Sequence, residues 1–347
     1  MKYAFNITPE ILSLISDLNE FKGEWKFLSQ LEPDKLASLK KVASIESIGS
    51  STRIEGSKLS DKEVEIILSN LDQESFRSRD EQEVAGYAFV CNEIFANYEY
   101  MDFSENLIKQ IHKWLLKYSE KDERHRGGYK TLSNSVEAHG PSGEFLGVVF
   151  ETATPFETPF KIAELVEWTN QEFDKKEIHP LIIIAIFIVD FLAIHQFQDG
   201  NGRLFRCLTN LLLLKSGYLY VPYSSLETVI EDNKKNYYLS LRQTQQSLKT
   251  ESPNFELWIL FFLRSLQKQK NILARKLGQY IEISSGLSAL SIEILSLLSS
   301  HGQLSVGDLE KLTKTNRSTI KNRLSDLITS NHILRHGKGP ATWYTLS

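Results

Sequence analysis

Twelve consecutive residues combine groups that suit phosphate chemistry: His195-Gln196-Phe197-Gln198-Asp199-Gly200-Asn201-Gly202-Arg203-Leu204-Phe205-Arg206. Gly200 and Gly202 allow positive φ angles and let a ligand approach without a Cβ in the way. If a helix begins directly after them, the amides of Gly200, Asn201 and Gly202 point outward at its N-terminus, where phosphate oxygens bind well. The stretch therefore predicts an anion site.

The charged side chains of this stretch extend that prediction. Arg203 and Arg206 are three positions apart, hence on one helix face, and carry forked donors that match phosphate. Asp199 offers the hard oxygen that Mg²⁺ prefers, and His195 could take a proton from an incoming hydroxyl. Each of these features alone has a structural explanation: His195 could be a packing residue, Asp199 a helix N-cap, and Gly-Asn-Gly a simple turn. Together they favour transfer of a nucleotide phosphate, with Phe197 in the core.

The positioning elements are mostly helices, because apolar residues recur at three and four positions through most segments. Asp190 directly follows the apolar run at 181–189 and is expected to be buried with a structural hydrogen bond. The sequence thus predicts a mainly α protein with helices near 9–20, 36–49, 60–70, 80–97, 104–118, 159–174, 179–194, 203–216, 230–247 and 254–281.

Two segments depart from this rhythm. Gly127 to Phe160 is rich in glycine and proline and contains the β-prone run Gly147–Phe150, which predicts a surface loop or hairpin. After a linker at Ser284–Gly286, helices near 288–299, 305–312 and 316–329 precede two strand-like pieces at 333–335 and 342–346. That order predicts a winged helix.

Charge gives this C-terminal module a separate character. From Arg264 to Ser347 there are 12 Lys/Arg and 5 Asp/Glu, a net +7, which leaves −11 for the rest of the −4 chain. The module could contact DNA phosphates through Arg317, Lys321, Arg323 and Lys338, or serve protein interaction and dimerisation. The scattered Cys91 and Cys207 and the lack of a signal-peptide or membrane-spanning run favour a cytoplasmic protein without a membrane partner. The histidines without ligand spacing are expected to be surface or packing residues: His112, His125, His139 and His179.

The twelve-residue stretch resembles the Fic (Fic/DOC) family signature His-x-Phe-x-(Asp/Glu)-Gly-Asn-Gly-Arg-x-x-Arg at every defined position; only Gln196 departs from its commonest form, in which proline is usual. The resemblance implies an all-helical protein adenylyltransferase that transfers AMP from ATP to a Ser, Thr or Tyr hydroxyl of a target protein. It makes His195 the general base and Asp199 the Mg²⁺ ligand. It also assigns the anion hole to Gly200, Asn201 and Gly202. The β- and γ-phosphates would be neutralised by Arg203 and Arg206.

A second stretch, Ser51-Thr52-Arg53-Ile54-Glu55-Gly56, is similar to the family's inhibitory motif (Ser/Thr)-x-x-x-Glu-(Gly/Asn). The resemblance implies that Glu55 pairs with Arg206 and blocks the seat of the γ-phosphate. It also implies that residues 127–160 are a flap that holds an extended target segment, and that the nucleotide pocket is walled by Tyr237, Tyr238 and Gln245.

The expected domains are an N-terminal helical region at 1–100, a Fic-type core at 101–260, a connecting helix and linker at 261–286, and the winged helix at 287–347. Other functions stay open: removal of AMP with Glu55 positioning water, donors such as UTP or CDP-choline, or a DNA-binding regulator that senses nucleotide. A homodimer is open as well.

Overall fold

The computed structural model describes residues 3, 5–28, 33–71, 76–139, 145–248, 250, 253–284, 287–337, 339 and 342–347. By its contacts the chain divides into two compact units, Met1–Gln30 with Lys40–Lys270 and Leu31–Leu39 with Asn271–Ser347. Several residues singled out in the sequence lie outside the described ones: Gly140, Pro141, Gly143, Ser285, Gly286, Lys338 and Pro340.

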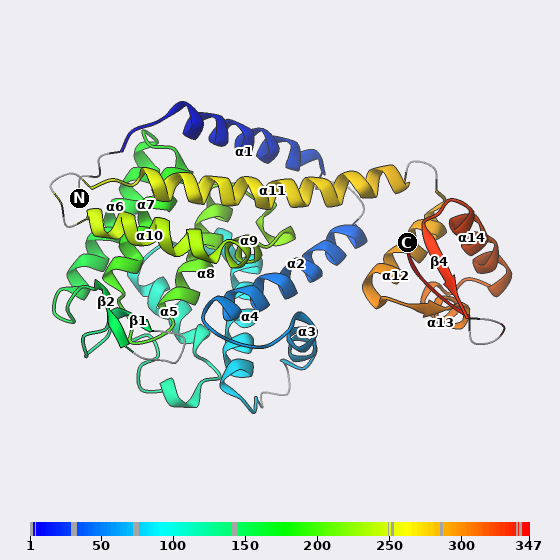
Figure 1. Ribbon diagram of the computed structural model, residues 1–347, viewed down its shortest axis with the longest axis horizontal. Coiled ribbons are helices and arrows are strands. Elements are labelled where there is room, and N and C mark those ends of the chain that lie inside the picture. Colours follow the sequence, from blue (N-terminus) through cyan, green and yellow to red (C-terminus); the bar gives the residue numbers. More distant parts are fainter. Residues whose placement is uncertain are drawn as a thin grey trace. The chain divides into compact units, whose positions relative to one another are not determined.

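The predicted helical character is confirmed (Figure 1). Up to residue 284 the α-helices are α1 (Pro9–Leu28), α2 (Pro33–Ile54), α3 (Asp61–Ser69), α4 (Arg79–Asn97), α5 (Glu105–Leu115), α6 (Thr158–Lys175), α7 (Pro180–Ile194), α8 (Asn201–Lys215), α9 (Leu226–Asp232), α10 (Lys234–Ser247) and α11 (Glu256–Ser284). Short 3₁₀ turns lie at Tyr98–Tyr100, Glu120–Asp122 and Val221–Tyr223.

Helix α7 forms the centre of the larger unit. Every residue from Leu181 to Phe191 is buried, as expected for a helix that is apolar on all sides. It packs against α6, α8 and α10, and Trp258 of α11 donates its Nε1–H to the Ala185 carbonyl at 2.9 Å. The structural hydrogen bond expected for Asp190 is confirmed, because the hydroxyl of Tyr3 donates to it. This core fixes where α7 ends, and therefore where His195 stands.

Three of the predicted helices differ most from the structure. Helix α1 continues to Leu28, because Phe21 and Trp25 add a buried turn. Helix α2 continues to Ile54 through a hydroxyl-rich run that propensity disfavours, where Ser51 Oγ accepts from Arg206 Nε at 2.8 Å and Ser50 Oγ contacts Thr228 Oγ1 at 2.9 Å. The single helix expected at 230–247 is two helices, α9 and α10, separated by Asn233, whose φ of −118° and ψ of 29° are not helical.

The hairpin expected between Gly127 and Phe160 is present. Strands β1 (Ser135–His139) and β2 (Phe145–Glu151) pair antiparallel, with Ser135 opposite Glu151, and the β-prone run lies inside β2. The hairpin lies at one edge of the helical bundle, where β2 contacts α10 (Figure 1). The short loops at its base contact the end of α7.

The smaller unit contains the elements expected for a winged helix, in the predicted order. These are α12 (Ala289–His301), β3 (Leu304–Ser305), α13 (Val306–Thr313), α14 (Arg317–Thr329), β4 (Ile333–His336) and β5 (Trp343–Leu346), with strand order β3-β5-β4. Their shared core includes Ile294, Leu298, Leu309, Ile320 and Leu324. Across the described parts of the chain, no helix has the length and apolar character needed to cross a membrane.

Candidate active site

The loop between α7 and α8 is closed by its own hydrogen bonds. His195 ends α7 in the left-handed region with φ 52°, and Gly200, with φ 78°, precedes the first residue of α8, Asn201. The Asn201 side chain accepts from the Phe197 amide at 3.0 Å and donates to the Phe197 carbonyl at 2.7 Å. Helix α8 thus begins two residues earlier than predicted, and the amides of Asn201 and Gly202 belong to its first turn. That is the arrangement that favours an anion.

His112 of α5 supports this loop from beneath. Its ring stacks on Phe197 with centroids 3.7 Å apart, Nδ1 accepts from the Gly127 amide at 2.9 Å, and Nε2 faces the Asp199 carbonyl at 3.1 Å. An amide can only donate, so the hydrogen of the neutral ring lies on Nε2 and is donated to Asp199. Burial lowers the pKa of His112 to about 4, which keeps the ring neutral. The packing role expected for His112 is present. The sequence did not predict that His112 supports the loop, because the residues it contacts there lie 85 to 87 positions later in the chain.

His195 is poised as a neutral base. Burial, followed by the charge of Lys130, lowers its pKa to about 4, against the opposing charges of Glu55 and Asp199. Its ring also hydrogen-bonds the Leu192 backbone. A carbonyl can only accept, so the ring nitrogen facing it carries hydrogen and the other nitrogen remains an acceptor. At neutral pH the imidazole can therefore receive a proton.

A cavity of about 310 Å³ opens beside this loop, at the lower end of the range for small-molecule sites. It brings His195, Asp199 and the first turn of α8 together with residues that directly follow α2 and with residues of α4, all more than 110 positions upstream. Its lining is Glu55, Gly56, Ser57, Arg79, Asp80, Glu83, His195, Gln198, Asp199, Gly200, Asn201, Gly202 and Arg203.

Asp199 is paired with cations. Arg79, the first residue of α4 after the Ser78 capping box, places Nη2 at 2.5 Å from one carboxylate oxygen, and Arg203 Nη2 lies 3.8 Å from the other. Glu83 lies between the two arginines, 2.8 Å from Arg79 Nε and 3.2 Å from Arg203 Nη1. The contact with Arg203 is an ion pair without hydrogen-bond geometry. Sequence reasoning missed Arg79 and Glu83, because only the fold brings α4 to the loop.

Asp199 could still hold Mg²⁺. No group of three or more potential metal ligands occurs within the described ranges, so a cage made only of protein side chains is not present there. Mg²⁺ commonly binds one or two carboxylates and completes its shell with phosphates and water. Asp199, with 41% of its side chain exposed and facing the cavity, fits that mode once Arg79 moves away.

Arg206 lies beyond the cavity and is occupied by α2. Its side chain is 2% exposed; Nη2 donates to Glu55 Oε1 at 2.7 Å and to the Ser51 carbonyl at 3.0 Å, and Nε donates to Ser51 Oγ at 2.8 Å. The Glu55 carboxylate also reaches the start of α8, since a Cβ added at Gly202 would lie 2.2 Å from Oε1. Glu55 therefore stands between the cavity and Arg206, over the first turn of α8.

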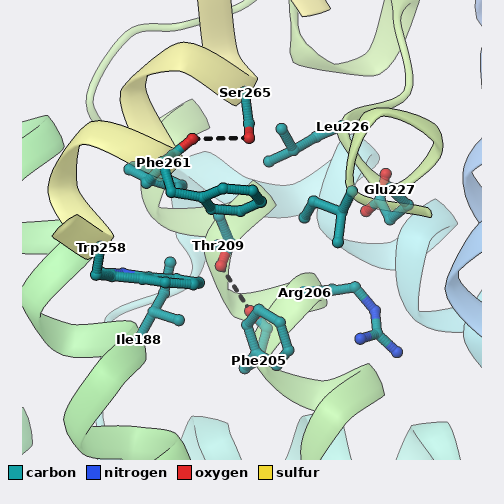
Figure 2. Close-up of a pocket in the computed structure, with 11 residues that line it drawn as sticks. Ile188, Phe205, Arg206, Thr209, Leu226, Glu227, Trp258, Phe261 and Ser265 are labelled. Carbon is teal, nitrogen blue, oxygen red and sulfur yellow. Dashed lines mark hydrogen bonds between the residues drawn. The ribbon is translucent and has the colours of Figure 1, made fainter. Parts of the chain in front are cut away.

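The far side of Arg206 is closed by packing. Figure 2 shows Ile188, Phe205, Trp258 and Phe261 around a void of only about 10 Å³, which is at most the room of one water. Thr209 and Ser265 turn their hydroxyls onto the Phe205 and Phe261 carbonyls at 2.8 Å each. This packing fixes α8 and leaves no ligand site behind Arg206.

The residues expected to wall the nucleotide base are near the ion pair but outside the cavity. Tyr237 is buried and stacks on Phe205, with centroids 6.4 Å apart. Tyr238 is 40% exposed, and the charges of Glu55 and Arg206 act on the pKa of both tyrosines, after the raising effect of burial. Gln245 is buried in α10. A contact of these three with nucleotide stays a prediction.

Comparisons with known proteins point to one family. The family model described as Fic/DOC family matches residues 102–213, which contain the whole loop between α7 and α8. A probable protein adenylyltransferase of Aquifex aeolicus is 32% identical over 100 residues, 29% of this chain and 28% of its own length. The protein adenylyltransferase Fic of Drosophila willistoni is 26% identical over 185 residues, 53% of this chain and 34% of its own. The chain thus spans about a third of the length of these curated relatives.

Solved structures share the fold. A Fic family protein from Desulfovibrio desulfuricans G20 aligns over 100% of this chain and 98% of its own, with a TM-score of 0.63 and 22% identity. A Fic domain containing signaling protein from Bacteroides thetaiotaomicron aligns over 78% of this chain and 98% of its own, with a TM-score of 0.58 and 24% identity. At these identities the likeness concerns the fold alone. Residues 102–213, about a third of the chain, are thus similar to the Fic/DOC family, and the chain shares the fold of these solved structures.

Proposed function

We propose that this chain is a protein adenylyltransferase that moves AMP from ATP to a Ser, Thr or Tyr hydroxyl of a target protein. The observation that carries the proposal is the cavity in which a neutral His195, the carboxylate of Asp199 and the first turn of α8 converge. Buried guanidinium donors support it further: Nε of Arg203 and Nη1 of Arg206 lack a hydrogen-bond partner among the described residues. Unmatched buried donors beside a helix N-terminus suit a polyphosphate.

In this mechanism the target hydroxyl loses its proton to the free nitrogen of His195 as its oxygen attacks the α-phosphorus. The bond from that phosphorus to the β-phosphate oxygen breaks, and pyrophosphate leaves. The amides of Asn201 and Gly202, with Arg203, would stabilise the charge that develops on the leaving phosphates. Mg²⁺ held by Asp199 would neutralise phosphate charge when bound.

Glu55 restrains this reaction. Its carboxylate takes a donor of Arg206 that the γ-phosphate would use, and it adds negative charge where phosphate would enter. ATP would then bind without its γ-phosphate against Arg206, and the α-phosphorus would not be presented to the hydroxyl. Release of Glu55 is the proposed activating step.

The proposal is tested by incubating the full chain with ATP labelled in the α-phosphate, Mg²⁺ and a cell lysate. Label should enter this chain or a lysate protein, and His195→Ala should remove it. A matched change at an unrelated histidine, His301→Ala in α12, should leave labelling unchanged. Covalent label that survives His195→Ala would contradict the assignment of the base.

Removal of AMP is the second candidate, and one observation favours it: the carboxylate of Glu55 and the imidazole of His195 line the same cavity. A carboxylate there could orient a water toward the phosphorus of an AMP-modified hydroxyl. Feeding an AMP-modified substrate without ATP separates the directions. Release of AMP that needs Glu55 would support removal.

For the smaller unit we propose a contact with DNA phosphates. Arg317 and Lys321 are exposed on α14, whereas Arg323 is paired with Asp326 at 3.1 Å and has less to offer than predicted. Weak binding that falls steeply with salt and with Arg317→Ala plus Lys321→Ala would support the contact. Salt-insensitive binding to a protein would favour the interaction module instead.

A further inference from the structure

The backbone of His195 is held in a conformation that few side chains adopt. Its φ of 52° and ψ of 58° lie in the left-handed region, which costs a non-glycine residue about 1 to 3 kcal/mol and persists where surrounding contacts over-determine it. The 3.0 Å bond from the His195 amide to the Phe191 carbonyl closes α7 but leaves the carbonyls on either side of His195 to other partners.

Both of those carbonyls bind the same residue. Lys130 donates its Nζ to the Ile194 carbonyl at 3.0 Å and its backbone amide to the Gln196 carbonyl at 2.9 Å. The side chain is 3% exposed, and Nζ also donates to Asn134 Oδ1 at 2.7 Å and Thr152 Oγ1 at 2.9 Å. All three hydrogens of the ammonium are therefore used.

The remaining partners come from the base of the hairpin. Asn134 directly precedes β1, and Thr152 directly follows β2. Asn134 also donates its Nδ2 to the Phe197 carbonyl at 2.9 Å, so Lys130 and Asn134 together bind the carbonyls of residues 194, 196 and 197. Among the described residues, the hydrogen-bond partners of Lys130 are Asn134, Thr152, Ile194 and Gln196, and these four do not line the 310 Å³ cavity.

We propose that Lys130 is a positioning residue for the transfer reaction, holding the carbonyls of Ile194 and Gln196, the residues on either side of His195, so that the His195 imidazole stays directed at the cavity. This inference rests on the proposed function. The ammonium also acts on the imidazole through its charge, since it lowers the pKa of His195 while Glu55 and Asp199 raise it. A lysine suits this position better than a neutral donor, because its Nζ supplies three hydrogen bonds and a positive charge from one buried atom.

The test measures self-labelling by the full chain in the Glu55→Gly background, at saturating ATP and across ATP concentration. Lys130→Met should lower the saturated rate by about 100-fold, the loss that a displacement near 1 Å can cause, with the half-saturating ATP concentration unchanged within about twofold. Lys130→Arg, which keeps charge and donors, should recover at least about a tenth of the rate. Lys161→Met, an equally non-polar change at an exposed lysine of α6, should change neither value. A rate within about twofold for Lys130→Met, or a loss confined to ATP affinity, would overturn the inference.

A second measurement needs no catalysis. The His195 ring carbons are followed by NMR against pH, with His195→Ala for assignment, and Lys130→Met should raise the pKa of His195 while Lys161→Met leaves it in place. If the Glu55→Gly protein transfers no AMP at all, the proposed function fails, whereas this titration still decides the role of Lys130. Should Lys130→Met not fold, Thr152→Val removes one Nζ partner and keeps the charge, and it should lower the rate at unchanged ATP affinity. An unmoved His195 pKa in Lys130→Met, or an unchanged rate in Thr152→Val, counts against the proposal.

Discussion

Glu55 and the γ-phosphate of ATP require the same atoms of Arg206 in this account. The guanidinium is 2% exposed, its Nη2 is shared between Glu55 and Ser51, and the cavity reaches Glu55 but not the arginine. A buried charge-assisted hydrogen bond contributes about 1.5 to 3 kcal/mol, which corresponds to a change of about 10- to 100-fold in an equilibrium. A single side chain can therefore set whether the site accepts a complete triphosphate.

Gln196 is the position where the signature departs from its commonest form. Its side chain is fully buried, and neither its Oε1 nor its Nε2 has a hydrogen-bond partner within the described part of the chain. An unsatisfied buried amide costs about 1 to 3 kcal/mol. Gln196→Met, which keeps the volume and removes both polar atoms, should raise the free energy of unfolding by about that amount in urea titrations. Gln246→Met, at an exposed glutamine of α10, is the control; a destabilised Gln196→Met protein would mean that the amide is bonded in solution.

Asp190 predicts a pH-dependent stability of definite sign. Burial raises its pKa to about 6 from 3.8, and the Tyr3 hydroxyl opposes this only in part. The carboxylic acid form is favoured in the folded state, so the stability it contributes is present at low pH and is lost as pH rises through 6. Asp190→Asn should therefore gain stability relative to the parent by roughly 1 to 1.5 kcal/mol between pH 5 and pH 7.5.

The quantity to measure is the difference in the free energy of unfolding between the parent and Asp190→Asn, by urea unfolding at pH 5 and pH 7.5. His112 and His195, whose lowered pKa values act in the opposite direction, contribute equally to both proteins and cancel. A difference that stays constant with pH would show that Asp190 is already charged, or not buried, in solution.

Among the helices, α2 presents Glu55, and polar contacts with α9 and α10 hold its last turns. Arg53 pairs with Glu231 at 2.8 Å and with Asp61 at 2.8 Å, Ser50 contacts Thr228 at 2.9 Å, and Lys234 Nζ donates to the Ile54 carbonyl at 2.8 Å. Because these contacts are polar, we expect Glu55 to be released by an exchange of polar partners.

Arg53→Ala should loosen this end of α2 and raise AMP transfer several-fold, because Glu55 would occupy Arg206 for less of the time. Transfer is measured by the label incorporated per minute at saturating ATP. Arg264→Ala, which breaks an exposed pair with Glu10, is the matched control and should have no effect. In the Glu55→Gly background Arg53→Ala should add nothing further; an additional rise there would mean that Arg53 acts on the site by another route.

Local sequence was sufficient for much of this architecture. The apolar run of α7, the glycines at the start of α8 and the β-prone run of β2 each carry their signal within a few residues, and the predicted elements are present. The extension of α2 through Ser51 accompanies a tertiary contact with Arg206, which local propensity does not contain, and the break at Asn233 was not predicted.

The candidate site was predictable to the same extent. His195 to Arg206 lie within twelve residues, and the inhibitory hexapeptide has its own pattern, so both could be singled out. Arg79, Glu83, His112 and Lys130 have no such pattern, because each acts on the loop from 64 to 120 positions away. Only the fold reveals that Arg79 occupies the carboxylate proposed for Mg²⁺.

In the candidate site of the larger unit, charged side chains are paired inside the chain. Three arginines of the site are paired with three carboxylates: Arg79, Arg203 and Arg206 with Asp199, Glu83 and Glu55. A magnesium nucleotide brings both signs of charge and would replace these internal pairs with its own phosphates and cation. In the proposed function, activation would therefore be an exchange of partners rather than the creation of a new charge.

The central claim is that Glu55 limits transfer by holding Arg206, and intact-mass measurement of four full-length proteins with ATP and Mg²⁺ tests it most directly. These are the parent, Glu55→Gly, Arg206→Ala and the double variant. Glu55→Gly should gain one AMP at least about 10-fold faster than the parent, in line with the loss of one charge-assisted hydrogen bond. Arg206→Ala should be inactive with or without Glu55. Equal rates for the parent and Glu55→Gly, or a rise on removing Glu55 that persists without Arg206, would contradict the account.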